Sequence, residues 1–123
     1  MEKQQLIREA KNLSLHLRES REYQAYTAAR ETAFANDTTK ALIEQYHRLQ
    51  LKAQGDMLSC GKAEDKTMEE LKKLGELLQF NPTAAGFLMA EYGLNQLLSE
   101  VYQALGQGLD LSLPAMSQEE GQA

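Results

Sequence analysis

The chain has 123 residues, 42% hydrophobic and 25% charged, which is the length and balance of one soluble globular domain. Its formal net charge is −5 and no stretch of the sequence gathers Lys and Arg into a basic stripe, so direct binding to nucleic acid is not expected. The single cysteine, Cys60, excludes an internal disulfide and a four-thiolate metal site within one chain.

Only two prolines interrupt a composition rich in Ala, Leu, Gln, Glu and Lys, which favours helix throughout. The first predicted helix covers residues 2–19. Apolar side chains recur on one of its faces at three- and four-residue steps: Leu6, Ile7, Ala10, Leu13 and Leu17. This start of the chain is amphipathic and unlike a signal peptide, so we expect a cytoplasmic protein.

The middle of the chain predicts three further helices. Ser20 is a good N-cap for a helix over residues 20–36, and Asp37 or Thr38 is the expected cap of a helix that ends near Ser59. Gly61 then supplies a stop, because glycine tolerates the left-handed conformation at a helix C-terminus. The fourth helix is predicted to start between residues 65 and 67, with Thr67 and Glu70 as a capping box.

The last helix, over residues 81–109, is the longest and the least charged. Asn81 is its expected N-cap and Pro82 suits its first turn. It contains no Lys or Arg, and its only acids are Glu91 and Glu100. Because its glutamates and amides interrupt the apolar residues, it is not a membrane span.

Apolar residues cover so much of this helix that the chain's own helices are expected to bury only part of it. A two-fold homodimer, or an assembly of dimers, is the simplest way to cover the rest. The predicted interface combines two adjacent stripes: Phe87, Leu88, Glu91, Leu94, Asn95, Leu98, Val101 and Leu105.

The predicted fold is all-α, an antiparallel bundle of about five helices with a long C-terminal helix. Residues 1–109 form one domain, and residues 110–123 form a flexible acidic tail.

No set of residues predicts a metal site, a cofactor or catalysis. His16 and His47 lie on separate predicted helices, and Glu44 with His47 supplies only one of the two Glu-x-x-His elements of a di-metal bundle. Glu91 and Asn95 are neighbours on the least charged helix. A buried Glu91 would need a partner, such as Arg30, Arg48 or an arginine of another chain.

Two runs of sequence resemble the YlbF/YmcA family, which includes YheA. They are Asn81-Pro-x-x-x-x-Phe-Leu-x-Ala-Glu-x-x-Leu-Asn-Gln-Leu-Leu-x-Glu-Val and, near the start, Arg18-Glu-Ser-Arg-Glu-Tyr-Gln-Ala-Tyr. Leu42-Ile-Glu-Gln-Tyr-His-Arg-Leu-Gln is similar to the middle of that family. The likeness spans about residues 3–109 and is nearest to YheA-like members.

This resemblance implies a small helical bacterial protein that dimerises or assembles further and regulates competence, sporulation or biofilm formation. YlbF and YmcA act in a complex that influences RNase Y and mRNA processing, so protein partners in such a complex are implied. That complex is linked to iron–sulfur clusters through cysteines; with Cys60 alone, this chain departs from it and no cofactor is expected.

The sequence therefore favours a non-enzymatic regulatory or adaptor protein acting through helix-mediated protein–protein contacts. Two alternatives stay open. One is a ligand-binding or catalytic helical bundle that uses Glu91 and Asn95, and the other is a purely structural homo-oligomer.

Overall fold

The computed structural model describes residues 2–112, and these form five helices and no strand. The helices are α1 (Lys3–Arg18), α2 (Arg21–Phe34), α3 (Asp37–Cys60), α4 (Asp65–Gln79) and α5 (Pro82–Gly108). The predicted all-α fold with a long last helix is confirmed. The part of the predicted acidic tail beyond residue 112 lies outside the described residues.

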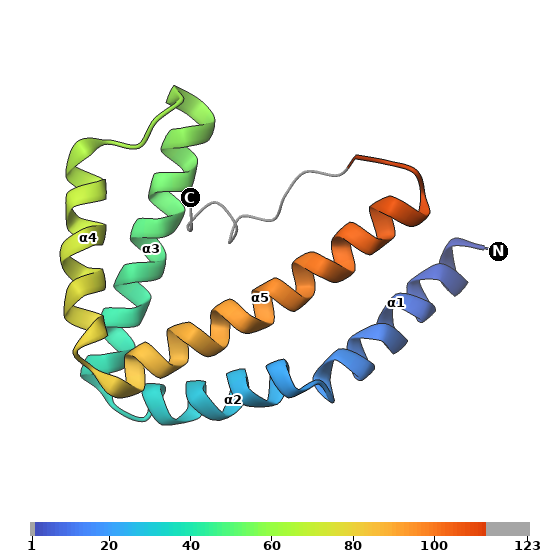
Figure 1. The fold of residues 1–123 in the computed structure, drawn as a ribbon, viewed down its shortest axis with the longest axis horizontal. Helices are drawn as coiled ribbons and strands as arrows, with labels where there is room; N and C mark the ends of the chain where they lie inside the picture. The colour runs from blue at the N-terminus through green and yellow to red at the C-terminus, as the bar shows by residue number, and fades with distance from the viewer. Residues whose placement is uncertain (1, 113–123) are drawn as a thin grey trace.

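The helices are arranged as an arm and a hairpin that meet at one end (Figure 1). In the arm, α2 packs along α5, and α1 continues beyond α2 in nearly the same direction. In the hairpin, α3 and α4 are antiparallel neighbours, as predicted for consecutive helices. α1 does not fold back on α2. Two residues separate the helices, and the Gln24 side chain donates a hydrogen bond to the Arg18 carbonyl across this junction at 2.7 Å.

The structure confirms the predicted helix ends at Ser20 and Gly61. Ser20 Oγ accepts the Tyr23 N–H at the start of α2, and Gly61 has a φ of 82° after the end of α3. The predicted cap of α3 was wrong: Asn36 caps it and accepts the Thr39 N–H at 3.0 Å. The sequence reading missed this because Asn36, Asp37 and Thr38 are all residue types that suit an N-cap.

The predicted capping box of α4 was also wrong. The helix begins at Asp65, within the predicted range, but Glu64 and not Thr67 stands at the N-cap position. Thr67 is 1% exposed inside the first turn, where its hydroxyl accepts a hydrogen bond from Lys52. A tertiary contact with α3 therefore replaces the local cap.

The core lies where the arm and the hairpin meet. Phe87 is 1% exposed, and its ring centroid lies 5.5 Å from that of Tyr26 and 5.4 Å from that of Phe34, both on α2. Around it lie the other buried residues of this cluster, drawn from α2, α3, α4 and α5: Ala33, Ile43, Leu74, Leu78 and Ala84. Neither α1 nor the far end of the hairpin takes part in this cluster.

Candidate interaction surfaces

α1 is amphipathic, yet none of its residues is buried. Its predicted apolar face is largely open to solvent: Leu6 is 53% exposed, Ile7 48% and Leu13 38%. We call Leu6, Ile7, Ala10, Leu13 and Leu17 the α1 stripe. The Glu2 and Gln5 side chains form a capping box at the start of this helix, which fixes its first turn.

The predicted interface residues of α5 fall into different environments. Phe87 is part of the chain's own core, packed under α2. Leu105, near the far end of α5, is 56% exposed. The others are half-buried: Leu88, Glu91, Leu94, Asn95, Leu98 and Val101. Of the predicted interface residues, the structure therefore leaves Leu105 open to solvent and six others partly accessible.

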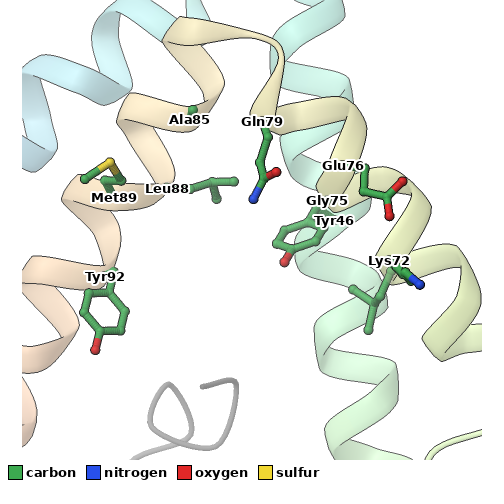
Figure 2. Close-up of a pocket in the computed structure, with 10 residues that line it drawn as sticks. Tyr46, Lys72, Gly75, Glu76, Gln79, Ala85, Leu88, Met89 and Tyr92 are labelled. Atoms are coloured by element: carbon green, nitrogen blue, oxygen red, sulfur yellow. The ribbon is translucent and has the colours of Figure 1, made fainter. Parts of the chain in front are cut away.

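An open groove of about 560 Å³ lies between the hairpin and α5 (Figure 2). Tyr46 and Leu71 line its hairpin side, and Leu88, Met89 and Tyr92 line its α5 side. Polar groups of α4 also line the hairpin side: Lys72, Glu76 and Gln79. The groove is thus an apolar furrow whose only cation and carboxylate lie together on α4.

Within the described chain Glu91 pairs with His47 and not with Arg30 or Arg48, the two partners suggested by the sequence; an arginine of another chain stays untested. Oε1 of Glu91 lies 3.0 Å from Nε2 of His47, with 26% of the Glu91 side chain and 32% of the His47 side chain exposed. The hydrogen bond to Glu91 raises the pKa of His47, and the negative charges of Glu91 and Glu44 add to this against the opposing effect of burial. Arg30 instead lies 4.7 Å above the ring of Phe34.

The sequence singles out both His47 and Glu91 but does not show that they pair. His47 attracts attention only beside Glu44, one turn earlier on the same helix, whereas its bonded partner is 44 residues away on α5. Only the tertiary arrangement of α3 and α5 brings it to Glu91. The alternative role of Glu91 and Asn95 in catalysis or ligand binding stays a prediction.

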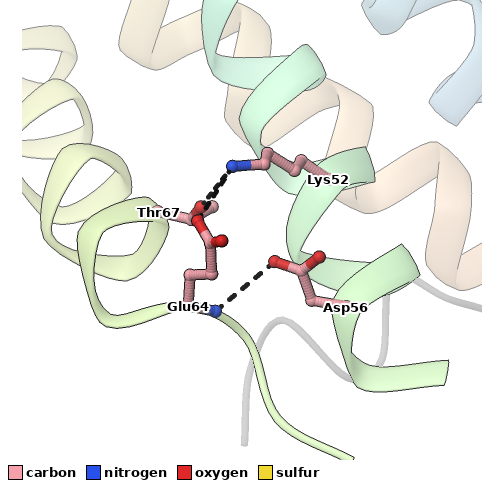
Figure 3. A network of polar contacts seen from close by, with 4 residues as sticks. All are labelled: Lys52, Asp56, Glu64 and Thr67. Carbon is pink, nitrogen blue, oxygen red and sulfur yellow. Dashed lines mark hydrogen bonds and ion pairs between the residues drawn. The ribbon is translucent and has the colours of Figure 1, made fainter. Parts of the chain in front are cut away.

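A polar network holds the end of the hairpin at which the loop joins α3 to α4 (Figure 3). Lys52 donates to Glu64 Oε2 at 3.1 Å and to Thr67 Oγ1 at 3.2 Å, and the Glu64 N–H donates to Asp56 Oδ2 at 3.4 Å. The pairing with Glu64 raises the pKa of Lys52. These contacts tie the start of α4 to α3, which is a structural role.

Within residues 2–112, no three His, Cys, Asp or Glu side chains come together in a way that would hold a metal ion. Cys60 is exposed at the end of α3, apart from both histidines in the sequence. No helix in this part of the chain has the length and hydropathy needed to cross a membrane.

Comparison with known proteins decides the family. A family model described as control of competence regulator ComK, YlbF/YmcA, matches residues 6–110. The chain belongs to the YlbF/YmcA family. That description is of regulation and not of an enzymatic reaction.

Relatives of this family member come from several bacteria. A UPF0342 protein of Symbiobacterium thermophilum is 32% identical over 105 residues, 85% of this chain and 94% of that protein. UPF0342 proteins of Clostridium novyi and Halothermothrix orenii are 24% and 26% identical, over 80% and 89% of this chain and 86% of each relative. No solved structure matches the chain at the significance applied to these relatives.

Proposed function

We propose that the chain is a non-enzymatic regulatory or adaptor protein that acts through helix-mediated protein–protein contacts and self-associates as a homodimer or a dimer-based oligomer. The observation that carries this proposal is α1, a helix of 16 residues that buries none of them. Isolated helices of about this length are marginal in water, because most helical stability in proteins comes from packing an amphipathic face. A second chain would supply that packing.

One end of the molecule offers surfaces for self-association. α1 and the far half of α5 both extend away from the hairpin (Figure 1). Besides the α1 stripe, this end exposes Leu105, Leu109 and Leu111, which are 56%, 66% and 56% accessible. A second copy that covers these residues would bury the apolar surface that the monomer leaves in water.

Family membership supports the regulatory part of the proposal, since the family is described by control of a competence regulator. We extend this to the class of partner: cytoplasmic protein subunits of an RNA-processing complex of the kind associated with YlbF and YmcA. A protein partner suits the surface better than RNA does, because the chain has a net charge of −5 and binding to phosphates would require a basic surface.

Sedimentation of two matched variants tests self-association. Leu13→Asp places a charge in the α1 stripe, whereas Leu15→Asp places the same charge on the same helix outside the stripe, at a residue that is 57% exposed. We expect the wild type and Leu15→Asp to sediment as dimers at tens of micromolar, and Leu13→Asp to sediment as a folded monomer. Circular dichroism would verify that helices α2 to α5 remain formed.

A monomeric wild type at these concentrations would contradict the proposal. Equal dissociation of both variants would also contradict it, because charge on α1 would then act without regard to the stripe.

A further inference from the structure

The arm and the hairpin diverge from a common base. At that base the Asn81 side-chain amide donates to Thr39 Oγ1 at 3.0 Å, and Ile43 and Phe87 are buried beside it in the core. Beyond the base, α3 and α5 separate in the manner of the two sides of a V (Figure 1).

The His47–Glu91 pair crosses this V. His47 lies eight residues beyond Thr39 on α3, roughly 12 Å along the helix, and Glu91 lies ten residues beyond Asn81, roughly 15 Å along α5. It is a side-chain hydrogen bond that joins α3 to α5 beyond the base. The pair therefore connects the two helices at a point beyond the packed base.

The groove shares its walls with the pair. Tyr46 precedes His47 on α3, and Tyr92 follows Glu91 on α5, and both tyrosines line the groove (Figure 2). Any change in the separation of α3 and α5 at the pair would change the width of the groove.

We propose that the His47–Glu91 pair is a pH-sensitive strut that holds the hairpin against α5 and sets the width of the groove between them. When His47 is protonated, an imidazolium faces a carboxylate and the V is held closed. When His47 is neutral, the charge attraction is lost and the hairpin is free to swing outward from its base.

The surroundings of His47 favour this response. Glu91 faces it from α5 and Glu44 lies one turn earlier on α3, so two carboxylates favour the protonated ring. Phe87, whose ring centroid is 6.2 Å from that of His47, is its apolar neighbour on α5. No charged group of α2 or α4 within residues 2–112 contributes to the shift in the pKa of His47.

The natural placement of Cys60 allows a direct distance measurement. Cys60 is exposed at the end of α3, and a second cysteine introduced by Gln107→Cys would lie at the exposed far end of α5. With spin labels on both cysteines, pulsed electron–electron double resonance measures the distance between the far ends of α3 and α5. A tenfold excess of unlabelled protein removes distances between chains, and a His16→Gln background leaves His47 as the only histidine.

We expect a narrow distance distribution at pH 5.5 that moves several ångströms longer and broadens at pH 8.5. Glu91→Gln should give the long, broad distribution at both pH values, whereas Glu44→Gln should retain most of the pH response. The proposal is overturned if the distribution is the same at both pH values, or if Glu91→Gln leaves the pH response intact. It is also overturned if Glu44→Gln abolishes the response as fully as Glu91→Gln, since general charge and not the strut would then be responsible.

Discussion

Asn81 uses its one side chain twice, capping α5 with its oxygen and binding Thr39 of α3 with its nitrogen. Its Oδ1 accepts the N–H groups of Thr83 and Ala84, each at 3.2 Å, and its Nδ2 donates to Thr39 Oγ1 at 3.0 Å. Thr39 is only 4% exposed, so no other donor reaches its oxygen easily. The start of the longest helix is thereby fixed to the start of the hairpin.

We predict that Asn81→Ala lowers the free energy of unfolding by about 2–3 kcal/mol, since it removes an N-cap worth roughly 1 kcal/mol and leaves the Thr39 hydroxyl without its donor. Ser20→Ala is the comparison, because Ser20 also caps a helix but its hydroxyl reaches only the Leu17 carbonyl, three residues earlier at the end of α1. Ser20→Ala should lower the free energy of unfolding by about 1 kcal/mol. Urea denaturation measures both, and equal losses would show that the bond to Thr39 contributes nothing.

Phe87 should be the most costly residue to truncate. Its side chain lies among Tyr26, Phe34 and Ile43 in the core, and we expect Phe87→Ala to lower the free energy of unfolding by about 3–5 kcal/mol. Met89, two residues away on the same helix, is 76% exposed, and Met89→Ala should change stability by no more than about 0.5 kcal/mol. Chemical denaturation of the two variants would contradict the assigned core if their losses were similar.

The stability of the protein should depend on pH through His47. The folded-state pKa of His47 is raised above the ordinary value of 6.5, so its stabilising contribution is complete below about pH 6.5 and is lost as the pH rises through the higher, folded-state pKa. The difference in urea midpoint between the wild type and His47→Gln should therefore be larger at pH 6 than at pH 9. His16→Gln, which removes an exposed histidine of α1, is the control. A difference that grows with rising pH would have the wrong sign for this pair.

The end of α5 offers a stabilising substitution. The Leu111 N–H donates to the Gly106 carbonyl at 2.8 Å and the Asp110 N–H to that of Gln107 at 3.1 Å, which places Asp110 at the left-handed position of a Schellman motif with a φ of 57°. Glycine adopts this conformation without steric cost. Asp110→Gly should raise the free energy of unfolding by about 0.5–1 kcal/mol, measurable as a higher melting temperature. A lower melting temperature would mean that the Asp110 side chain makes a favourable contact outweighing this strain.

The local features of the fold could be predicted because they depend on short stretches of sequence. Asn81 followed by Pro82, and Ser20 three residues before Tyr23, define helix starts by their own chemistry, and the structure confirms both. The capping box of α4 was mispredicted because the Thr67 hydroxyl binds Lys52, which is 15 residues away.

Contacts between side chains of different helices were harder to predict, because they join residues far apart in the sequence. Glu91 was recognised as a carboxylate in need of a partner, but the direction in which α3 leaves the base decides that His47 and not an arginine reaches it. The sequence also placed Phe87 in a stripe that contacts another chain, because helical spacing does not show which helix covers a residue. Its helical spacing fits the stripe, yet the aromatic rings of α2 enclose it within its own chain.

Hydrogen–deuterium exchange of α1 over a dilution series tests the central claim, that a second chain packs on this helix, most directly. Because α1 buries no residue in the isolated chain, its backbone amides gain protection chiefly by association. We predict slow exchange in residues 3–18 at tens of micromolar and fast exchange once the protein is diluted enough to dissociate, while α2 and α5 stay protected throughout. Exchange of α1 that is equally fast, or equally slow, at every concentration would contradict this account.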